Sequence, residues 1–582
     1  MSAKAGSRRV PIQGRETEPA PAGWNSVRNL EQVLTLEVAL YLVAAALGGL
    51  LRFLLLDLRP LSAEEGTLAL ESYRIWLGQP PESLSQGPLL AYGNALALAM
   101  FAEGDGAARF VSALSGSALV ALPYLLRASL GRVPALLAAF GFALSPLLVF
   151  ASRDVTGGVV PVTLGLLLWW TLERGAKRLD AGRAYGTGLL VAGLVTSGNE
   201  GITVLVTLAL AALLSHPQPL SLLRESRAVA ASPLGRRSAA ACAVALVVVG
   251  MNFGSHLPGI QWALVDVWTS WVGSFSLSAP RGSLLLLLAM YEFPVLLLGG
   301  IQMVRAIFRR ERVDGFLALW LMLVLLFTMV QTSGAISRLI LPIVPLYLLA
   351  TRLAAESLSL AKGVRIDWKW FAAALAVAVP LGVGTVLLNR GSTPATSTPA
   401  PFLYLEIALV IVGALAVGLL LDGRGRAALA WFTVMLACVG YTLHGTAFLN
   451  YRIESLSMEP VIGTQVAPDL RDAALAAAYY SAYHRTPVAV DPQLRVPLAW
   501  YLRGTREVEY SAQSTQGIAL SLSQLPQVKL DPSVERIPGL FSPTVSSRDL
   551  TWQGAWRWAV GRDGLVRPNP RDIIVRAPAG NW

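Results

Sequence analysis

Hydrophobic residues gather in long runs that are separated by short polar segments. The runs lie near 33–55, 87–103, 108–126, 133–150, 156–173, 184–198, 201–214, 238–252, 283–304, 313–331, 339–351, 370–388, 403–421 and 427–448. Many approach the length of about 20 residues that an α-helix needs to cross the hydrocarbon core of a bilayer. The pattern predicts a mainly α fold, a polytopic bundle of membrane helices over residues 33–450.

The basic residues between the runs predict how the chain is oriented. Short cytoplasmic loops collect Lys and Arg, and the N-terminal tail, residues 1–32, holds five of them. Every later basic loop falls on the same side if the run 87–103 lies at the outer interface instead of crossing. We therefore expect about thirteen crossings, a cytoplasmic N-terminus and an acidic first outer loop over residues 57–107.

The last part of the chain, residues 451–582, has the polarity of an ordinary soluble domain. Its pattern predicts a helix over 469–484, a strand over 487–491, a helix over 497–503 and a strand over 507–510. We expect a small C-terminal α/β domain on the extracytoplasmic face.

Composition excludes several classes of protein. Of the 582 residues, 54% are hydrophobic and 14% charged, whereas a soluble domain carries about 25% charged residues. Neither a soluble enzyme nor a disordered chain fits. The formal net charge is +11, and the basic residues lie in the short loops between apolar runs. This distribution argues against nucleic acid as a partner. Cys242 and Cys438 lie far apart in apolar runs, so we expect no disulfide.

Carboxylates at the expected outer face are the strongest candidates for chemistry. Glu64 and Glu65 open an expected helix over residues 63–77, and Asp154 follows the run 133–150. A helix N-terminus favours ionised carboxylates, so a purely structural role for the glutamates is an alternative. Glu200 lies between two short runs and is either partly buried and functional or solvated in a turn.

Basic residues at the same face could bind an anion. Arg338 stands at the start of a run, where a guanidinium can hold a phosphate through two parallel hydrogen bonds, and Arg153 adjoins Asp154. The alternatives are an interfacial arginine that reaches toward lipid headgroups and a local Arg–Asp pair. The four histidines lack metal-ligand spacing, and no GxxxxGK[ST] phosphate loop occurs.

Several of these segments together resemble a known family. They read AEEGTLALESYRIW (63–76), GPLLAYGNALALAMF (87–101), GDGAARFVSALSGSALVALPYLL (104–126) and ALSPLLVFASRD (143–154). This order is similar to the GT-C membrane glycosyltransferases, which include protein O-mannosyltransferases and lipid A aminoarabinose transferases. The tail segment VAVDPQLRVPLAWYLRG (488–504) is most similar to the flippase-activity-associated branch of archaeal N-glycosylation clusters.

The resemblance implies a multi-pass plasma-membrane glycosyltransferase. It would move a sugar from a polyprenyl-phosphate donor to a protein, glycan or lipid acceptor at the outer face. Glu64 and Glu65 take the places of an Asp-Glu pair, Asp154 matches the second acidic position, and Arg338, with Arg153, would meet the donor phosphate.

Other interpretations stay open. We expect no cofactor, with a divalent cation shared by Glu64 and Asp154 as an alternative. Gln86-Gly87-Pro88 lacks the family's His. A non-catalytic partner of a glycan assembly machinery and a transporter or lipid flippase are the alternative functions.

Overall fold

The structure is a computed structural model of the whole chain. It describes residues 35–79, 87–101, 103–175, 180–251, 254, 261–276, 281–309, 311–332, 335–359, 423–452, 459–461, 465–505, 507–511, 518–522, 534–541, 543–545, 558, 566–567 and 569–576. The tail 1–32 and the predicted spans 370–388 and 403–421 lie outside these residues.

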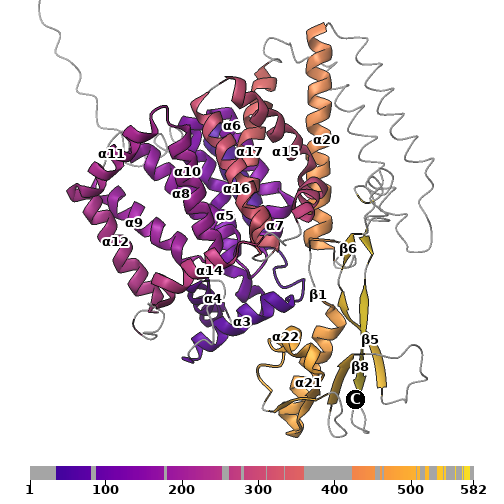
Figure 1. Cartoon of the computed structure of the whole chain (residues 1–582). Helices are drawn as coiled ribbons and strands as arrows, with labels where there is room; N and C mark the ends of the chain where they lie inside the picture. The colour runs from indigo at the N-terminus through magenta and orange to yellow at the C-terminus, as the bar shows by residue number, and fades with distance from the viewer. Residues whose placement is uncertain are drawn as a thin grey trace, which may run out of the picture.

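Helices form a bundle from the N-terminal part of the chain up to residue 451, as Figure 1 shows. Their bounds are α2 Leu36–Phe53, α3 Ala63–Trp76, α4 Pro88–Phe101, α5 Asp105–Leu130, α6 Arg132–Leu144, α7 Pro146–Ser152, α8 Val159–Gly175, α9 Ala181–Thr196, α10 Asn199–Ser215, α11 Pro219–Ala231, α12 Pro233–Gly250, a π-helical turn Trp262–Asp266, α14 Val267–Gly273, α15 Arg281–Arg309, α16 Arg312–Val330, α17 Ala335–Ser359 and α20 Gly423–Tyr451.

Six helices in the described part of the chain are long and apolar enough to cross a membrane, or seven if the bent pair α6 and α7 counts as one span. The protein is therefore an integral membrane protein. The count of thirteen crossings stays a prediction. The run 87–103 forms α4, which has 14 residues and is about 21 Å long, shorter than the roughly 30 Å of the hydrocarbon core.

Two of the predicted spans are broken. The run 133–150 bends by 59° between α6 and α7, where Ser145 precedes Pro146 and the ring of a proline cannot continue the helical hydrogen-bond pattern. Helix α15 is kinked at Glu292, two residues before Pro294. The buried Glu292 carboxylate accepts hydrogen bonds from Ser145 and Tyr347, and it thereby joins the two breaks.

The C-terminal part contains a six-stranded sheet of order β1-β5-β8-β4-β2-β3, in which β2 pairs in parallel with β3 and β4. The bounds are β1 Gln465–Val466, α21 Pro468–His484, β2 Val488–Val490, α22 Arg495–Leu498, β3 Val508–Tyr510, β4 Ile518–Leu522, β5 Val534–Phe541 and β8 Pro570–Arg576, with β6 Thr544–Val545 and β7 Val566–Arg567 as a separate pair.

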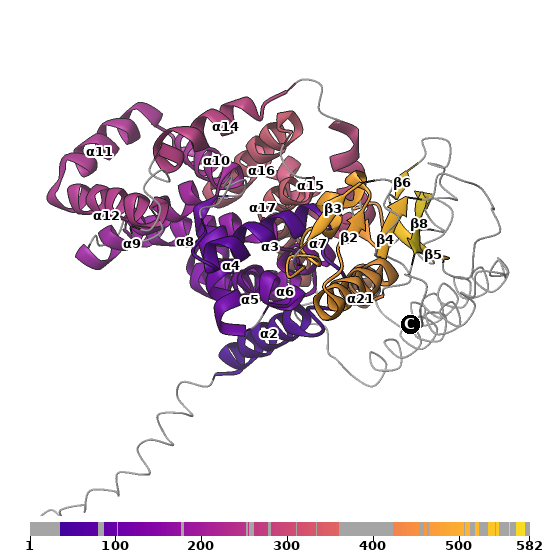
Figure 2. The ribbon, with the colours of Figure 1, turned by 90° about the horizontal axis from the view of Figure 1, so that it is seen from below.

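The sheet region packs against one end of the bundle. Figures 1 and 2 show α3 and α4 at that end, next to the strands and α21. A single hydrophobic cluster combines buried residues of both parts, among them Leu61 and Leu68 with Leu498 and Trp500. Burial of such apolar surface contributes roughly 25 cal/mol per Å². Because residues of the tail share this cluster with Leu61 and Leu68, the tail packs against the segment that opens α3.

Candidate functional site

Glu64 and Glu65, at the start of α3, have side chains in different environments. Ser62 caps the helix: its side chain accepts from the Glu65 amide, and the Glu65 carboxylate accepts from the Ser62 amide in return. Consecutive helical residues are rotated by about 100°. The two side chains therefore point in different directions: Glu65 is fully buried, whereas Glu64 is exposed.

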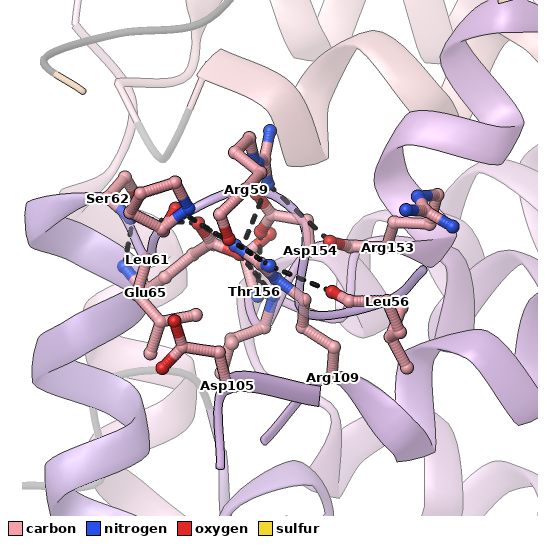
Figure 3. Close-up of polar contacts among 12 residues, drawn as sticks. Leu56, Arg59, Leu61, Ser62, Glu65, Asp105, Arg109, Arg153, Asp154 and Thr156 are labelled. Atoms are coloured by element: carbon pink, nitrogen blue, oxygen red, sulfur yellow. Dashed lines mark hydrogen bonds and ion pairs between the residues drawn. The ribbon is translucent and has the colours of Figure 1, made fainter. Parts of the chain in front are cut away.

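Glu65 lies in a cage of donors that Figure 3 shows. Arg109 in α5 holds both carboxylate oxygens, with Nε at 2.9 Å and Nη2 at 3.0 Å. Arg59 donates to the same carboxylate at 3.2 Å, and the Val155 amide also donates at 3.2 Å. Burial alone would raise the pKa of Glu65, but the charges of Arg109 and Arg59 outweigh it and lower the pKa to about 2.

Arg109 also fixes the loop that leads into α3. Its guanidinium donates to the carbonyl oxygens of Leu56, Arg59 and Pro60 at 3.0, 2.6 and 3.2 Å. The ion pair thus ties the loop to the first turn of α5. Glu65 consequently orders the site instead of facing it.

Asp154 is the second buried carboxylate, and it shares Arg59 with Glu65. It accepts from Arg59 Nη2 at 3.3 Å and from the Thr156 amide at 2.8 Å. Burial and the nearby charge of Glu65 raise the pKa of Asp154, although Arg59 and Thr156 act in the opposite direction. The structure thus brings Glu64, Glu65 and Asp154 into one region.

Glu64 has the properties expected of a proton acceptor. The surrounding protein disfavours its charged form, and the charges of Asp154, Glu200 and Glu65 add to this effect, so that its pKa is raised to about 7. Because the side chain remains exposed, a second molecule can reach it. A carboxylate with a pKa near neutrality, beside other carboxylates, is a candidate general base.

Arg338, in the first turns of α17, brings positive charge to the same region. Its Nη1 donates to the Gln331 carbonyl oxygen, and the side chain is half-buried. It lies close enough to Glu200 for the two charges to interact. Glu200, which opens α10, thereby connects Glu64 electrostatically with Arg338.

Arg153 contacts backbone carbonyl oxygens in the structure. Its guanidinium donates to the carbonyl oxygens of Leu51, Arg52, Leu54 and Leu55. These are carbonyls at the end of α2, which lack partners within the helix. Burial lowers the pKa of Arg153 to about 10. Since the donors serve the α2 terminus, a donor-phosphate role for Arg153 gains no support from these contacts.

Close backbone contacts bring the remaining outer segments together. Gly87, with φ of +95°, lies against the backbone of residues 196–198, and Gly158 lies against the Cα of Ser337. The starts of α3, α4, α10 and α17 and the 153–158 loop are thereby joined.

Sequence reasoning missed Arg59 and Arg109. Arg109 lies 44 residues from Glu65, and Arg59 lies 95 residues from Asp154, so local spacing could not reveal either pair. The quoted segment GDGAARF contains Arg109, which was the one available signal. In the described part of the chain, no group of three or more His, Cys, Asp or Glu residues could hold a metal ion.

The bundle, the site at its end and the sheet beside it define a GT-C-like membrane protein, and comparison with known proteins supports that fold. A family model described as dolichyl-phosphate-mannose-protein mannosyltransferase matches residues 85–235. No curated protein matches the sequence. The resemblance to the GT-C fold is confirmed, whereas the archaeal branch stays a prediction.

One solved structure has a similar fold over almost the whole chain. ArnT from Cupriavidus metallidurans, bound to undecaprenyl phosphate, superposes with a TM-score of 0.50 at 15% identity, covering 97% of this chain and 100% of that one. Its apo form gives 0.49 at 15% identity, covering 96% and 99%. The Archaeoglobus fulgidus oligosaccharyltransferase, in complex with Zn and sulfate, gives 0.34 at 12% identity, covering 81% and 62%.

Proposed function

We propose that the protein is an integral-membrane glycosyltransferase. It moves a sugar from a polyprenyl-phosphate donor to a protein, glycan or lipid acceptor on the extracytoplasmic face of the cell membrane. The observation that carries the proposal is Glu64, an exposed carboxylate whose pKa is raised to about 7 and which lies beside the Arg59-bound Asp154. The ArnT fold, seen there with undecaprenyl phosphate, supports a polyprenyl-phosphate donor.

In this proposal Glu64 is the base. It takes the proton of the acceptor hydroxyl while the hydroxyl oxygen bonds to the anomeric carbon of the sugar. The bond between that carbon and the donor phosphate breaks, and the phosphate leaves with the electron pair. A phosphate is a good leaving group, so this step needs positive charge more than it needs a general acid.

Arg338 supplies that positive charge. Its guanidinium, at the start of α17, stabilises the charge that develops on the departing phosphate. Asp154 and Glu65 act together through Arg59 and Arg109, and they hold the loop and α3 so that Glu64 faces the acceptor. Asp154, whose charge acts on Glu64, is the alternative base.

The orientation belongs to the same proposal. The N-terminal tail 1–32 is cytoplasmic, the unit 33–450 is the membrane domain, and residues 451–582 form the extracytoplasmic domain that shapes the acceptor site. The donor's lipid chain lies among the helices of the bundle, in contact with the bilayer.

Replacement of Arg338 tests the donor-phosphate step. Wild type and Arg338→Ala, purified and reconstituted in lipid, are incubated with a panel of radiolabelled polyprenyl-phosphate sugars and cell-envelope extract. Loss of one charge-stabilising donor costs about 100-fold in rate, and we expect a loss of that size in transferred label. Arg236→Ala, an exposed arginine at the start of α12, is the matched control and should transfer as wild type does.

Two outcomes contradict the proposal. Equal transfer by wild type and Arg338→Ala removes Arg338 from the donor step. No transfer by wild type with any donor of a broad panel contradicts the enzyme function and favours a non-catalytic partner of glycan assembly.

A further inference from the structure

Tyr501 connects the extracytoplasmic part of the chain with the loop before α3. Tyr501, which follows α22, is buried, and its hydroxyl donates to Asp105 Oδ2 at 3.0 Å. The hydroxyl oxygen of Tyr501 also accepts a hydrogen bond from the Leu61 amide at 2.7 Å. A single hydroxyl therefore bridges the first residue of α5 and the backbone just before Ser62, the cap of α3.

Neighbouring contacts fix the tyrosine in this position. Trp500 Nε1 donates to the other oxygen of Asp105 at 2.8 Å, and the Trp500 Cβ lies against Gly66 in α3. The guanidinium of Arg503 stacks on the Trp500 ring at 3.7 Å from its centroid and donates to the Glu103 carbonyl oxygen. Asp105 thus receives two donors from adjacent residues of the tail.

A second tail residue contacts the same turn. Gln465, at β1, donates from Nε2 to the Pro60 carbonyl oxygen at 2.8 Å, and Arg109 donates to that carbonyl from the bundle side. Residues 59–62 are therefore held from both sides: by Arg109 of the bundle and by Tyr501 and Gln465 of the tail.

Asp105 and Arg109 are one helical turn apart at the start of α5, which explains how the two sides are connected. Asp105 binds the tail, and Arg109 binds the Glu65 carboxylate and the loop. Glu64 follows Ser62 by two residues, so its direction depends on the position of this turn. A shift of about 1 Å in a reacting group can cost roughly 100-fold in rate.

We propose that Tyr501 is a positioning residue for Glu64: its hydroxyl bridge between Asp105 and the Leu61 amide lets the extracytoplasmic part of the chain set the geometry of the catalytic turn. This inference rests on the proposed transferase function. The segment VAVDPQLRVPLAWYLRG, which the family resemblance singled out, contains the tyrosine that makes the bridge.

Tyr501→Phe is the most direct test, because the phenyl ring keeps the packing and only the hydroxyl is lost. We expect kcat to fall about tenfold while the donor KM stays unchanged, since the change misplaces the base without touching the donor site. Hydrogen exchange of the Leu61 amide should become faster, because that amide loses its acceptor. Tyr483→Phe, an exposed tyrosine of α21 that is 76% accessible, is the matched control for both readouts.

A kcat of Tyr501→Phe equal to that of wild type overturns the proposal. Unchanged hydrogen exchange of the Leu61 amide in this variant also overturns it, whatever the value of kcat. If Tyr501→Phe does not fold, Gln465→Leu removes the other tail bond to the turn and is judged by the same two readouts. If wild type transfers no sugar, the transferase function fails by itself. The exchange measurement then decides whether the hydroxyl holds the turn.

Discussion

At the scale of residues, the site separates two adjacent carboxylates by burial and charge. Glu65 is caged by Arg59 and Arg109 and remains ionised, with a pKa of about 2. Glu64, one residue earlier, is exposed, and its pKa of about 7 allows it to gain and lose a proton near neutrality. One residue therefore orders the site, and its neighbour is available for chemistry.

The pH dependence of transfer follows from this difference. A base acts in its deprotonated form, so kcat/KM should rise with pH through a midpoint near 7 and level off above it, because the pKa of Glu64 is about 7. An unshifted glutamate, with a pKa near 4.3, would give a flat profile from pH 6 to 8. A pH series of initial rates in reconstituted vesicles distinguishes the two cases, and a flat profile would contradict the role of Glu64.

The sequence allowed part of this arrangement to be predicted. Glu64, Glu65 and Asp154 could be grouped because each follows or opens an apolar run on the same expected face. Their division of labour could not be predicted, since it depends on two long-range ion pairs, Arg109 with Glu65 and Arg59 with Asp154, which join positions 44 and 95 residues apart. The contacts of Arg153 could not be predicted for the same reason: its acceptors are carbonyls about 100 residues earlier.

At the scale of elements, short or broken helices distinguish this bundle from a set of plain crossings. Helix α4 is too short to span, α6 and α7 meet at 59°, and α15 is kinked at Glu292. Apolar runs predict that helices exist, but the run 133–150 breaks at Pro146, and Ser145 before it donates to the distant Glu292 carboxylate. Within the described residues the apolar runs correspond to helices, and hydropathy did not show where those helices bend.

The junction of α4 and α10 gives a prediction at this scale. At Gly87, φ is +95°, and an added Cβ would lie 2.9 Å from the Gly198 nitrogen. Gly87→Ala should therefore lower the melting temperature and reduce transfer, because α4 must move away from the start of α10, where Glu200 lies. Thermal unfolding in detergent and the transfer assay measure the two effects.

Gly300→Ala provides the matched control for that variant. Gly300 lies in α15, and an added Cβ there would meet nothing within 4 Å. We expect the control to keep wild-type stability and transfer. A Gly87→Ala protein that behaves like this control would show that the tight junction is not needed.

At the scale of the whole molecule, a GT-C-like bundle and a sheet region meet around one loop. The hydrophobic cluster that contains Leu61 and Trp500 joins them, and the site lies beside it. The sequence predicted a helical membrane part and a more polar tail. It could not predict that the tail contacts residues 57–66, because those contacts join positions about 400 residues apart.

The central claim is that Glu64 removes the acceptor proton during sugar transfer. The most direct measurement is the rate of label transfer from polyprenyl-phosphate sugars by wild type and Glu64→Gln in lipid, with Glu509→Gln, an exposed glutamate of β3, as the control. We expect that Glu64→Gln stays folded and loses at least about 100-fold in rate, while the control transfers normally. Equal rates in wild type and Glu64→Gln would contradict it.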